Sequence, residues 1–503
     1  MVKTKIIEVT KAGVFVCLFL LLGFPSRATE VLSIARDNTW TFTPELQKIH
    51  QLVLNLQTEQ AYKLLDKVKA DEFHKMYVLS FCETLDVLIT EDEVKFQKIE
   101  ATFRDRLKYL GGLSDNADAL FLQAELNLQR GFNFLNLGQE FNAVWAIKNA
   151  YNLTQECLKK YPDFVPIKKT SGVIEVMVGS VPDKYHFFMS LLGMKGSVVT
   201  GQKQLEQIRE SQSSLSIEAD LLYYTIKGLI NQQIDEAEKG FTDILKEQPD
   251  NKLALFLAVN MMMKNSQSED ALKLIHTLDA NPGGLPMFYI EYLRGEIMLQ
   301  KGDYTNAILS YQKFIDNYKS QNFKKDSYYK MSLAYYLLGK TDLAKANFDK
   351  AKSTGRSVAE PDHHADAQLK EGAFPNAKIL KVRMYTDGGY YKEAKDMFQT
   401  ITPAELKTKR EQVEYYYRKA RLAHKTNDIS AAKIFYKQTI DMSGESQWYF
   451  APNSALQLGY IAQASHDYSS AKKYFEMALA YKRHEYKNSI DGKAKSALEQ
   501  LRS

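Results

Sequence analysis

Small residues recur along the second half of the chain, each followed four residues later by an aromatic or large apolar side chain. The recurring residues are Ala237, Ala271, Ala307, Ala344, Ala394, Ala432 and Ala471. Residues four apart share one face of a helix, so each pair predicts a helix that packs closely against a neighbour. The spacings between successive alanines are 34, 36, 37, 50, 38 and 39 residues. A structural unit therefore repeats, and one copy alone could not bury its apolar face.

The stretch 452–481 contains the repeating unit in its most complete form. Gly459 lies in a first predicted helix, Asp467 and Tyr468 form a turn, and Phe475 follows Ala471 in a second helix. This pattern resembles the tetratricopeptide repeat, which has a period of about 34 residues. The resemblance implies an all-α fold, a right-handed superhelical solenoid of helix hairpins with a less regular helical N-terminal half. Such repeats serve many unrelated tasks, so the fold alone indicates no activity.

The first 28 residues have the features of a secretory signal. Lys3, Lys5 and Lys11 precede the apolar run 12–24, and small residues follow at the cleavage positions. The run is shorter than the roughly 20 residues that span a bilayer, so a cleaved signal is favoured over a retained anchor. We expect export across an inner membrane, to the periplasm or the outer membrane of a bacterium with two membranes.

The remaining chain divides into four predicted segments: an N-terminal helical domain with degenerate repeats at 29–215, repeats at 216–350, a polar insertion loop at 351–375, and repeats with a capping helix at 376–503. In the first of these, Trp40 and Phe42 are candidates to dock on the first helices. The two cysteines beyond the signal, Cys82 and Cys157, lie in apolar helical contexts, so we expect buried free thiols rather than a disulfide scaffold.

Several glycines interrupt an apolar region between residues 170 and 215. The segment 179–182 reads Gly-Ser-Val-Pro, and the segments 191–196 and 201–205 that follow it contain further glycines. Here the chain resembles the inclusion-body-clearance and outer-membrane family, which includes the tetratricopeptide-repeat 39 proteins. It departs from that family at Asp183, where a second proline is usual. The resemblance implies a helical repeat protein without known catalysis.

The net charge of the chain and its distribution limit the kinds of partner that we expect it to bind. Without the signal the chain carries 62 Lys and Arg against 60 Asp and Glu, and this near-neutral balance argues against a dedicated nucleic-acid binder. Residues 401–503 alone carry 17 Lys and Arg against 11 Asp and Glu. The basic C-terminal repeats favour an acidic partner, with peripheral association to a membrane surface as an alternative.

One cluster is a candidate for metal chemistry. Asp362, His363 and Asp366, within 360–366, could share a helix face and hold a divalent ion, as in an enzyme accessory. A solvated segment capped by Asp362 is the favoured interpretation. The motif Gly339-Lys340-Thr341 lacks the earlier glycine of a phosphate-binding loop. We therefore predict no catalytic residues, no metal and no cofactor.

The concave face of the solenoid is the remaining candidate site. In tetratricopeptide repeats the first helix of each hairpin lines the groove, and Tyr and Arg dominate binding hot spots. By this resemblance the groove residues are Tyr289, Tyr292, Tyr329, Tyr336, Arg383, Tyr417, Arg421, His424 and Tyr460. The predicted function is that of an exported, non-catalytic scaffold that binds a protein or peptide partner; oligomeric state is left open.

Overall fold

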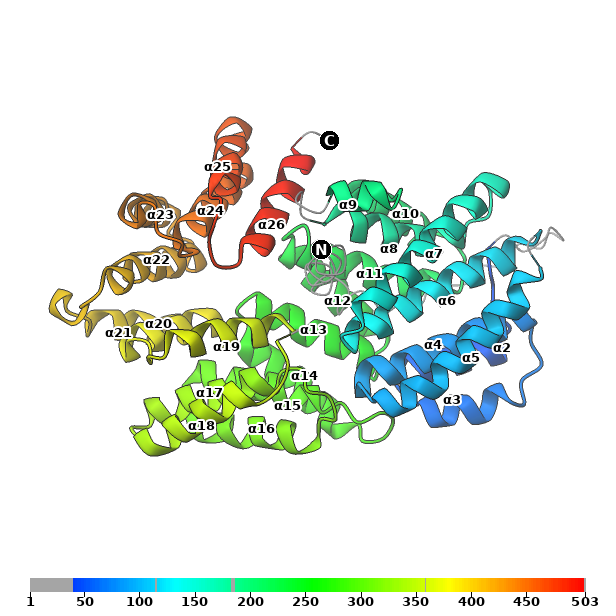
Figure 1. Cartoon of the computed structure of the whole chain (residues 1–503), viewed down its shortest axis with the longest axis horizontal. Coiled ribbons are helices and arrows are strands. Elements are labelled where there is room, and N and C mark those ends of the chain that lie inside the picture. Colours follow the sequence, from blue (N-terminus) through cyan, green and yellow to red (C-terminus); the bar gives the residue numbers. More distant parts are fainter. Residues whose placement is uncertain (1–38, 114, 182–185, 358, 502–503) are drawn as a thin grey trace. The chain divides into compact units, whose positions relative to one another are not determined.

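The computed structural model describes residues 39–113, 115–181, 186–357 and 359–501, and every regular element within these ranges is helical (Figure 1). The predicted all-α solenoid of helix hairpins is confirmed. The predicted signal, residues 1–28, lies outside the described residues. None of the described helices is long and apolar enough to cross a membrane.

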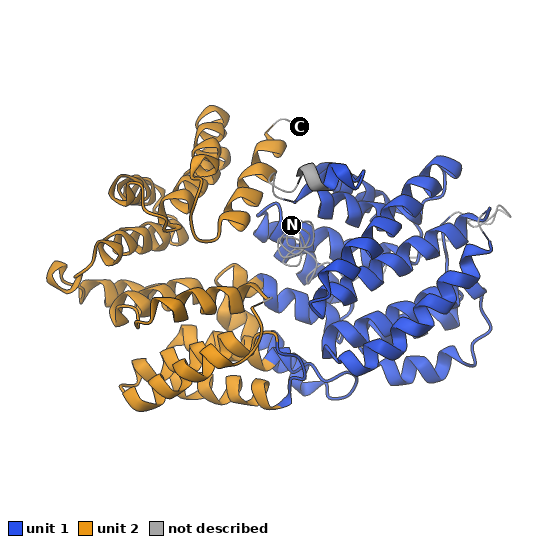
Figure 2. Ribbon diagram, in the orientation of Figure 1, with its two compact units in different colours: residues 1–261, 273–290, 317–321 blue, residues 262–272, 291–316, 322–503 orange. Residues whose placement is uncertain are grey.

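The chain forms two compact units, coloured separately in Figure 2. Unit 1 comprises residues 1–261, 273–290 and 317–321, and unit 2 comprises residues 262–272, 291–316 and 322–503. The boundary predicted at residue 215 therefore lies inside unit 1 rather than between the units. The helices α13 (Lys252–Lys264), α14 (Ser268–Ala280) and α15 (Tyr289–Lys301) each contain residues of both units, and the last residue of α16 (Tyr304–Asn317) also belongs to unit 1.

The other helices of unit 1 are α2 (Pro44–Leu54), α3 (Thr58–Leu65), α4 (Glu72–Thr90), α5 (Glu93–Gly111), α6 (Ala117–Asn136), α7 (Glu140–Lys160), α8 (Ile167–Gly179), α9 (His186–Leu191), α10 (Val198–Arg209), α11 (Ser216–Leu229) and α12 (Ile234–Glu247). Those of unit 2 are α16 (Tyr304–Asn317), α17 (Lys324–Leu337), α18 (Thr341–Ser353), α19 (Glu360–Glu371), α20 (Ala377–Gly388), α21 (Tyr391–Gln399), α22 (Lys409–Lys425), α23 (Ile429–Ser443), α24 (Phe450–Ala464), α25 (Tyr468–Ala480) and α26 (Lys487–Gln500), with a short 3₁₀ turn at Pro403–Glu405.

The alternation of small and large residues found in the sequence holds the hairpins together. All seven recurring alanines are fully buried. Where the first helix also carries a glycine, the aromatic ring of the second helix packs directly on it: a Cβ on Gly295 would lie 2.8 Å from the Tyr311 ring, and one on Gly459 would overlap the Phe475 ring. The missing side chain therefore provides the space that the ring fills.

Glycines of residues 170–215 also allow close packing in unit 1, and here one helix backbone lies directly against another. Gly172 of α8 and Gly201 of α10 face each other, and a Cβ on Gly172 would lie 2.8 Å from the backbone oxygen of Gly201. The two backbones are thus in direct contact, and neither can move aside as a flexible side chain could. Of the glycines in this region, Gly172, Gly179 and Gly201 are packing residues inside helices, whereas Gly193, with φ of 67°, and Gly196 lie in the connection between α9 and α10.

The predicted docking of the lead-in segment is confirmed. Trp40 and Phe42 are buried, and the Trp40 Nε1 donates a hydrogen bond to Asp118 Oδ1 of α6 at 2.6 Å. Cys82 and Cys157 are buried free thiols, as expected. Because Trp40 lies before the first described helix and contacts α6, the lead-in closes the N-terminal end of the unit 1 core.

Five helices of unit 1 meet at a buried network of charged and polar side chains. Lys169 of α8 donates to Glu125 of α6 at 2.8 Å, to Glu218 of α11 at 2.7 Å and to the Tyr77 hydroxyl of α4 at 2.7 Å. His50 of α2 lies 3.0 Å from Glu218. All five side chains are at most 2 % exposed. Each buried charge has an opposite charge in contact, which offsets the free energy lost by removing it from water.

The electrostatics of this network determine the ionisation of Glu218. Burial opposes ionisation, but the Lys169 ammonium and the His50 imidazole outweigh it and hold the pKa of Glu218 at about 2. The same carboxylates, with Glu125 first, raise the pKa of Lys169 against the effect of burial. The ionised forms of both groups are therefore the forms that the folded state prefers.

We expect Gly201→Ala to destabilise unit 1 by about 1–3 kcal/mol, because the new Cβ would overlap the Gly172 backbone oxygen. Urea unfolding followed by circular dichroism measures the loss. The control is Gly111→Ala, at the end of α5, where the nearest heavy atom would be 4.0 Å away; it should be neutral or slightly stabilising. Equal destabilisation by the two variants would contradict the close-contact interpretation.

Stability should fall as pH drops below about 4.5, because Glu218 is ionised in the folded state and gains a proton more readily when unfolded. The full contribution of Glu218 to stability is present above the pKa that this group has in the unfolded chain. It is lost as the pH falls towards the pKa of Glu218 in the folded state. The contribution is roughly 3 kcal/mol if the whole pKa difference acts on stability. Urea midpoints measured from pH 7 to about pH 3 should fall less steeply for Glu218→Gln than for the wild type. Parallel curves would show that this carboxylate does not carry the dependence.

Candidate functional site

The predicted groove residues of unit 2 lie on the first helices of successive hairpins. We call α17, α20, α22 and α24 the first-helix row; α20 contacts α22, and α22 contacts α24. Arg383 lies on α20, and Tyr417, Arg421 and His424 follow one another on one face of α22 at helical spacing. The row therefore brings two of the predicted arginines onto neighbouring helices.

Arg383 and Arg421 differ from most buried cations of the molecule in having little opposing charge in contact. The nearest carboxylate to the Arg383 guanidinium is Asp387 at 3.7 Å, and the Arg383 side chain is 37 % exposed. Arg421 is half-buried and its Nη1 donates to Gln457 Oε1 at 3.4 Å. Among the residues that the structure describes, no carboxylate lies within ion-pair distance of Arg421. Both guanidinium groups thus retain hydrogen-bond donors for a ligand.

Two other arginines on α22 are fully engaged. Arg418 donates to Glu414 at 2.7 Å and to the Tyr449 hydroxyl at 2.8 Å. Arg410 donates to Glu371 of α19 at 2.8 Å and to Glu485, just before α26, at 2.9 Å. These arginines hold the first-helix row in place and leave Arg383 and Arg421 as its open cations.

His424 lies next to these cations and is neutral at pH 7. Burial, together with the positive charges of Arg421 and Lys425, lowers its pKa to about 4. Its Nδ1 lies 3.3 Å from the Tyr436 hydroxyl. His424 therefore supplies a hydrogen-bonding group to this face, not a positive charge.

Three of the predicted tyrosines are buried between helices. The Tyr292 hydroxyl donates to Asp326 at 2.7 Å, Tyr329 packs on Phe348, and Tyr417 packs on Phe450. Each is at most 5 % exposed, so its contacts are internal.

The other predicted tyrosines are partly exposed. Tyr336 stacks on Phe374 with ring centroids 4.6 Å apart, and Tyr460 packs against Phe475. Tyr289 belongs to unit 1 and packs against Phe256. Of the nine predicted residues, Arg383, Arg421 and His424 with the edges of Tyr336 and Tyr460 are the ones that unit 2 leaves accessible on its first-helix row.

The insertion predicted at 351–375 as a polar loop, with a short helix at most, contains the helix α19 at residues 360–371. Its apolar stripe is short: Ala365 and Leu369 are buried with Asp362. So few buried positions among polar ones give a weak helical pattern. Pro361 in the first turn and Gly372, with φ of 75° at the C-cap, mark the two ends.

The candidate metal ligands of this segment are engaged with the protein. Asp362 is fully buried and accepts hydrogen bonds from the backbone N–H of Phe323 at 2.6 Å and of Asp326 at 2.9 Å. It therefore caps the start of α17 from another helix. Burial, with the negative charge of Asp326, raises the pKa of Asp362 to about 8. Asp366 pairs with Lys370 at 2.6 Å.

His363, the third candidate ligand, is exposed. Over the described ranges, no group of three or more His, Cys, Asp or Glu side chains is arranged to hold a metal ion. The cluster that the sequence suggested for metal binding is, at Asp362, a helix cap.

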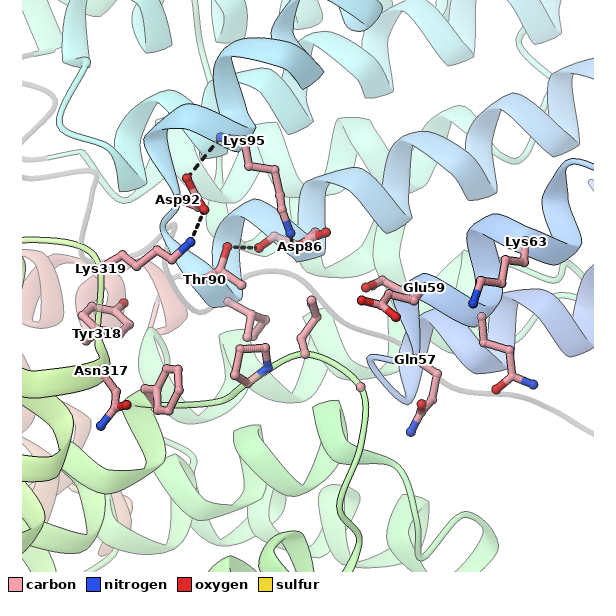
Figure 3. Close-up of a pocket in the computed structure, with 17 residues that line it drawn as sticks. Gln57, Glu59, Lys63, Asp86, Thr90, Asp92, Lys95, Asn317, Tyr318 and Lys319 are labelled. Atoms are coloured by element: carbon pink, nitrogen blue, oxygen red, sulfur yellow. Dashed lines mark hydrogen bonds and ion pairs between the residues drawn. The ribbon is translucent and has the colours of Figure 1, made fainter.

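Unit 1 contains a polar pocket of about 590 Å³ where the loop before α15 passes the first two hairpins (Figure 3). Lys95 on its wall pairs with Asp86 at 2.6 Å, and Lys319 pairs with Asp92 at 2.5 Å. Glu59 and Lys63 stand on the opposite side, on α3. Because these ion pairs are already made within the protein, the pocket offers few charges that a ligand could engage.

Three stretches of the chain match models of the tetratricopeptide repeat: residues 290–320, 326–354 and 413–445. They correspond to the hairpins α15–α16, α17–α18 and α22–α23. The chain contains tetratricopeptide repeats. No curated protein matches the sequence.

Solved structures with a similar helical arrangement include the apo form of the quorum sensor NprR from B. thuringiensis. It is 13% identical over 80% of this chain and 98% of that chain, with a TM-score of 0.31. The TPR domain of P58(IPK) is 17% identical, covering 75% of this chain and 98% of its own, with a TM-score of 0.20. The APC/C hetero-tetramer Cut9-Hcn1 is 12% identical over 89% and 95%, with a TM-score of 0.30.

Some residues of the first-helix row were missed from the sequence. Arg410 and Arg418 stand eight residues apart with Glu414 between them, a spacing that places all three on one side of α22. That signal favours a charged helix face, but not the long-range partners Glu371 and Glu485. These lie 39 and 75 residues from Arg410, and no repeat pattern connects them.

We expect Asp362→Ala to destabilise unit 2 by about 2 kcal/mol, because it leaves two backbone N–H groups of α17 without an acceptor. The two N–H groups bond different carboxyl oxygens, so Asp362→Asn keeps one acceptor and should lose about half as much stability. Thermal unfolding with and without added Zn²⁺ or Mg²⁺ measures both effects. A metal-dependent stabilisation of the wild type that Asp362→Asn abolishes would contradict the capping role.

Proposed function

We propose that this chain is an exported, non-catalytic scaffold whose first-helix row in unit 2 binds an acidic segment of a partner protein. The observation that carries the proposal is the pair of guanidinium groups, Arg383 and Arg421, on neighbouring repeat helices. Arg383 has only a long ion pair, 3.7 Å from Asp387, and Arg421 bonds the neutral Gln457. Export rests on the signal-like residues 1–28, and membership of the tetratricopeptide-repeat 39 group stays a prediction.

The chemistry of the two arginines favours a carboxylate partner. A guanidinium presents a planar fork of donors that matches a carboxylate with two parallel hydrogen bonds. A charge-assisted bond of this kind is also stronger than a neutral one, and it gains further where water is partly excluded. His424, neutral beside Arg421, adds a group that bonds a backbone or side chain without adding repulsion.

The charge of the C-terminal repeats supports the same class of partner. Residues 401–503 have six more basic than acidic residues. This excess attracts an acidic segment from a distance and raises its rate of association. The contacts at Arg383 and Arg421 then determine where the segment stays.

The length of the bound segment is limited by parts of unit 2 that already cover the row. Glu371 of α19 and Glu485 before α26 both pair with Arg410, and the Tyr486 hydroxyl bonds the His364 imidazole of α19. These contacts occupy the N-terminal end of α22. The accessible part lies towards its C-terminal end, near Arg421, and a short acidic stretch fits it better than a long helix.

The experiment captures partners from the native envelope by crosslinking to the exported protein, and then measures the affinity of the purified partner. The double variant Arg383→Glu with Arg421→Glu should abolish binding, because it replaces attraction with repulsion. Binding of the wild type should also weaken with rising salt concentration.

The matched control is Lys392→Glu with Lys472→Glu, which makes the same change of charge at exposed positions on the second helices α21 and α25. It should bind as the wild type does. If both double variants bind equally well, the first-helix row is not the contact surface.

A further inference from the structure

A groove in unit 1 lies between α5 and α7, over the surface of α6, with a volume of about 500 Å³. Both α5 and α7 contact α6, and the three helices run side by side (Figure 1). The volume falls within the range of roughly 300–1,000 Å³ that is usual for small-molecule sites. The groove belongs to neither the first-helix row of unit 2 nor the pocket of Figure 3.

One wall of the groove carries an exposed indole. The Trp145 side chain on α7 is 48 % exposed, whereas Trp40 is 1 % exposed. Phe141, one turn earlier and outside the lining, packs edge-on against it with ring centroids 6.2 Å apart and planes at 71°. The indole supplies a large apolar surface to the lining of the groove. A large aromatic half-exposed beside a cavity is a typical feature of a binding site.

Two guanidinium groups that line the groove share a single carboxylate, which leaves one net positive charge. Glu100 of α5 accepts two hydrogen bonds from Arg130 of α6, at 2.9 and 2.5 Å, and lies 3.5 Å from Arg104. One carboxylate therefore engages both guanidinium groups. Little free positive charge is left, which disfavours a nucleic acid or another strongly anionic ligand, since these need several open cations.

The remaining polar groups of the walls are amides. Gln97 stands on α5, and Asn142 and Asn149 stand on α7 one turn to either side of Trp145. All three are exposed. A carboxamide offers both a donor and an acceptor, as a sugar hydroxyl does. The Asn142 Nδ2 donates to Gln139 at 3.0 Å, which directs its oxygen outward as an acceptor.

From this arrangement we propose that the groove binds a neutral oligosaccharide, with one pyranose ring stacked on Trp145 and its hydroxyls hydrogen-bonded to Gln97, Asn142 and Asn149. The apolar C–H face of a pyranose matches the indole, and its rim of hydroxyls matches amides that lie on both sides of the ring. A partner helix fits less well, because Phe96 and Phe134 of the lining are buried, which leaves Trp145 as the exposed aromatic ring of the lining without a continuous apolar stripe. The site is independent of the function proposed for unit 2.

The test titrates the whole exported chain with a panel of neutral hexasaccharides: maltohexaose, cellohexaose, laminarihexaose, mannohexaose and chitohexaose. Isothermal titration calorimetry gives the affinity. Intrinsic fluorescence is measured in a Trp448→Phe background, because Trp448 is also partly exposed. Acrylamide then reaches Trp145 but not the buried Trp40. We expect at least one sugar to bind and to protect the accessible tryptophan emission from acrylamide.

Variants locate the site. Trp145→Ala should weaken binding at least about tenfold, and Asn142→Ala with Asn149→Ala should weaken it by a similar factor. Trp145→Phe keeps an aromatic platform and should retain part of the affinity, while the fluorescence response disappears. Tyr109→Ala, an equally exposed aromatic on α5 outside the groove, is the control and should bind as the wild type does. Circular dichroism confirms that each variant is folded.

The proposal is wrong if no sugar of the panel binds at concentrations up to about 10 mM. It is also wrong if a sugar binds equally well to Trp145→Ala. Protection of Trp145 by an envelope protein, and not by sugar, would assign the groove to a protein contact instead. None of these outcomes depends on Arg383 or Arg421, so failure here leaves the proposed function of unit 2 standing, and the converse also holds.

Discussion

The contact between a small residue on one helix and a large one on its neighbour is the constraint on which the rest of the structure depends. At Gly459 and Phe475 the ring takes the place of the missing side chain, and at Gly172 and Gly201 the two backbones touch. Protein interiors are packed so densely that even one added methyl group is felt. The close crossing therefore determines the geometry with which each pair of helices packs. That geometry in turn determines which helix faces contact the neighbouring hairpins and which face solvent.

Once those faces are fixed, the distribution of charge distinguishes structural residues from candidate binding residues. In unit 1, Lys169, Glu125 and Glu218 are enclosed together, and each charge is satisfied by the others. Removing one partner would leave an uncompensated charge in the core, which destabilises strongly. On the first-helix row of unit 2, Arg383 and Arg421 are not enclosed by opposite charges in this way. Charged residues thus stabilise the fold in unit 1 and remain available to a partner on the first-helix row of unit 2. The difference is whether the protein itself provides an opposite charge in close contact.

Sequence reasoning succeeded where a local pattern carries the structural information. Ala471 and Phe475 are four residues apart, so helical periodicity alone identified the hairpin, and the same spacing identified the other copies. It was less successful where contacts join distant residues. Asp362 caps α17 through Phe323, 39 residues earlier, and the Lys169 network draws on helices separated by more than a hundred residues. Nothing in the local sequence around Asp362 differs from that of an ordinary polar helix start, so its role could not be read there.

The tyrosines illustrate a second limit. Tyr292 and Tyr329 occupy positions that line the groove in tetratricopeptide repeats, yet both are buried in contacts with other side chains. A tyrosine has an apolar ring and a polar hydroxyl, so one that stands between helices can bury the ring and donate its hydroxyl to a carboxylate, as Tyr292 does to Asp326. An arginine in the same row is harder to bury because its charge needs an opposite charge as well as space. Of the residue types predicted for the groove, arginine is for this reason the more informative. Arg418, which pairs closely with Glu414, is buried, whereas Arg383, which lies 3.7 Å from Asp387, stays 37 % exposed.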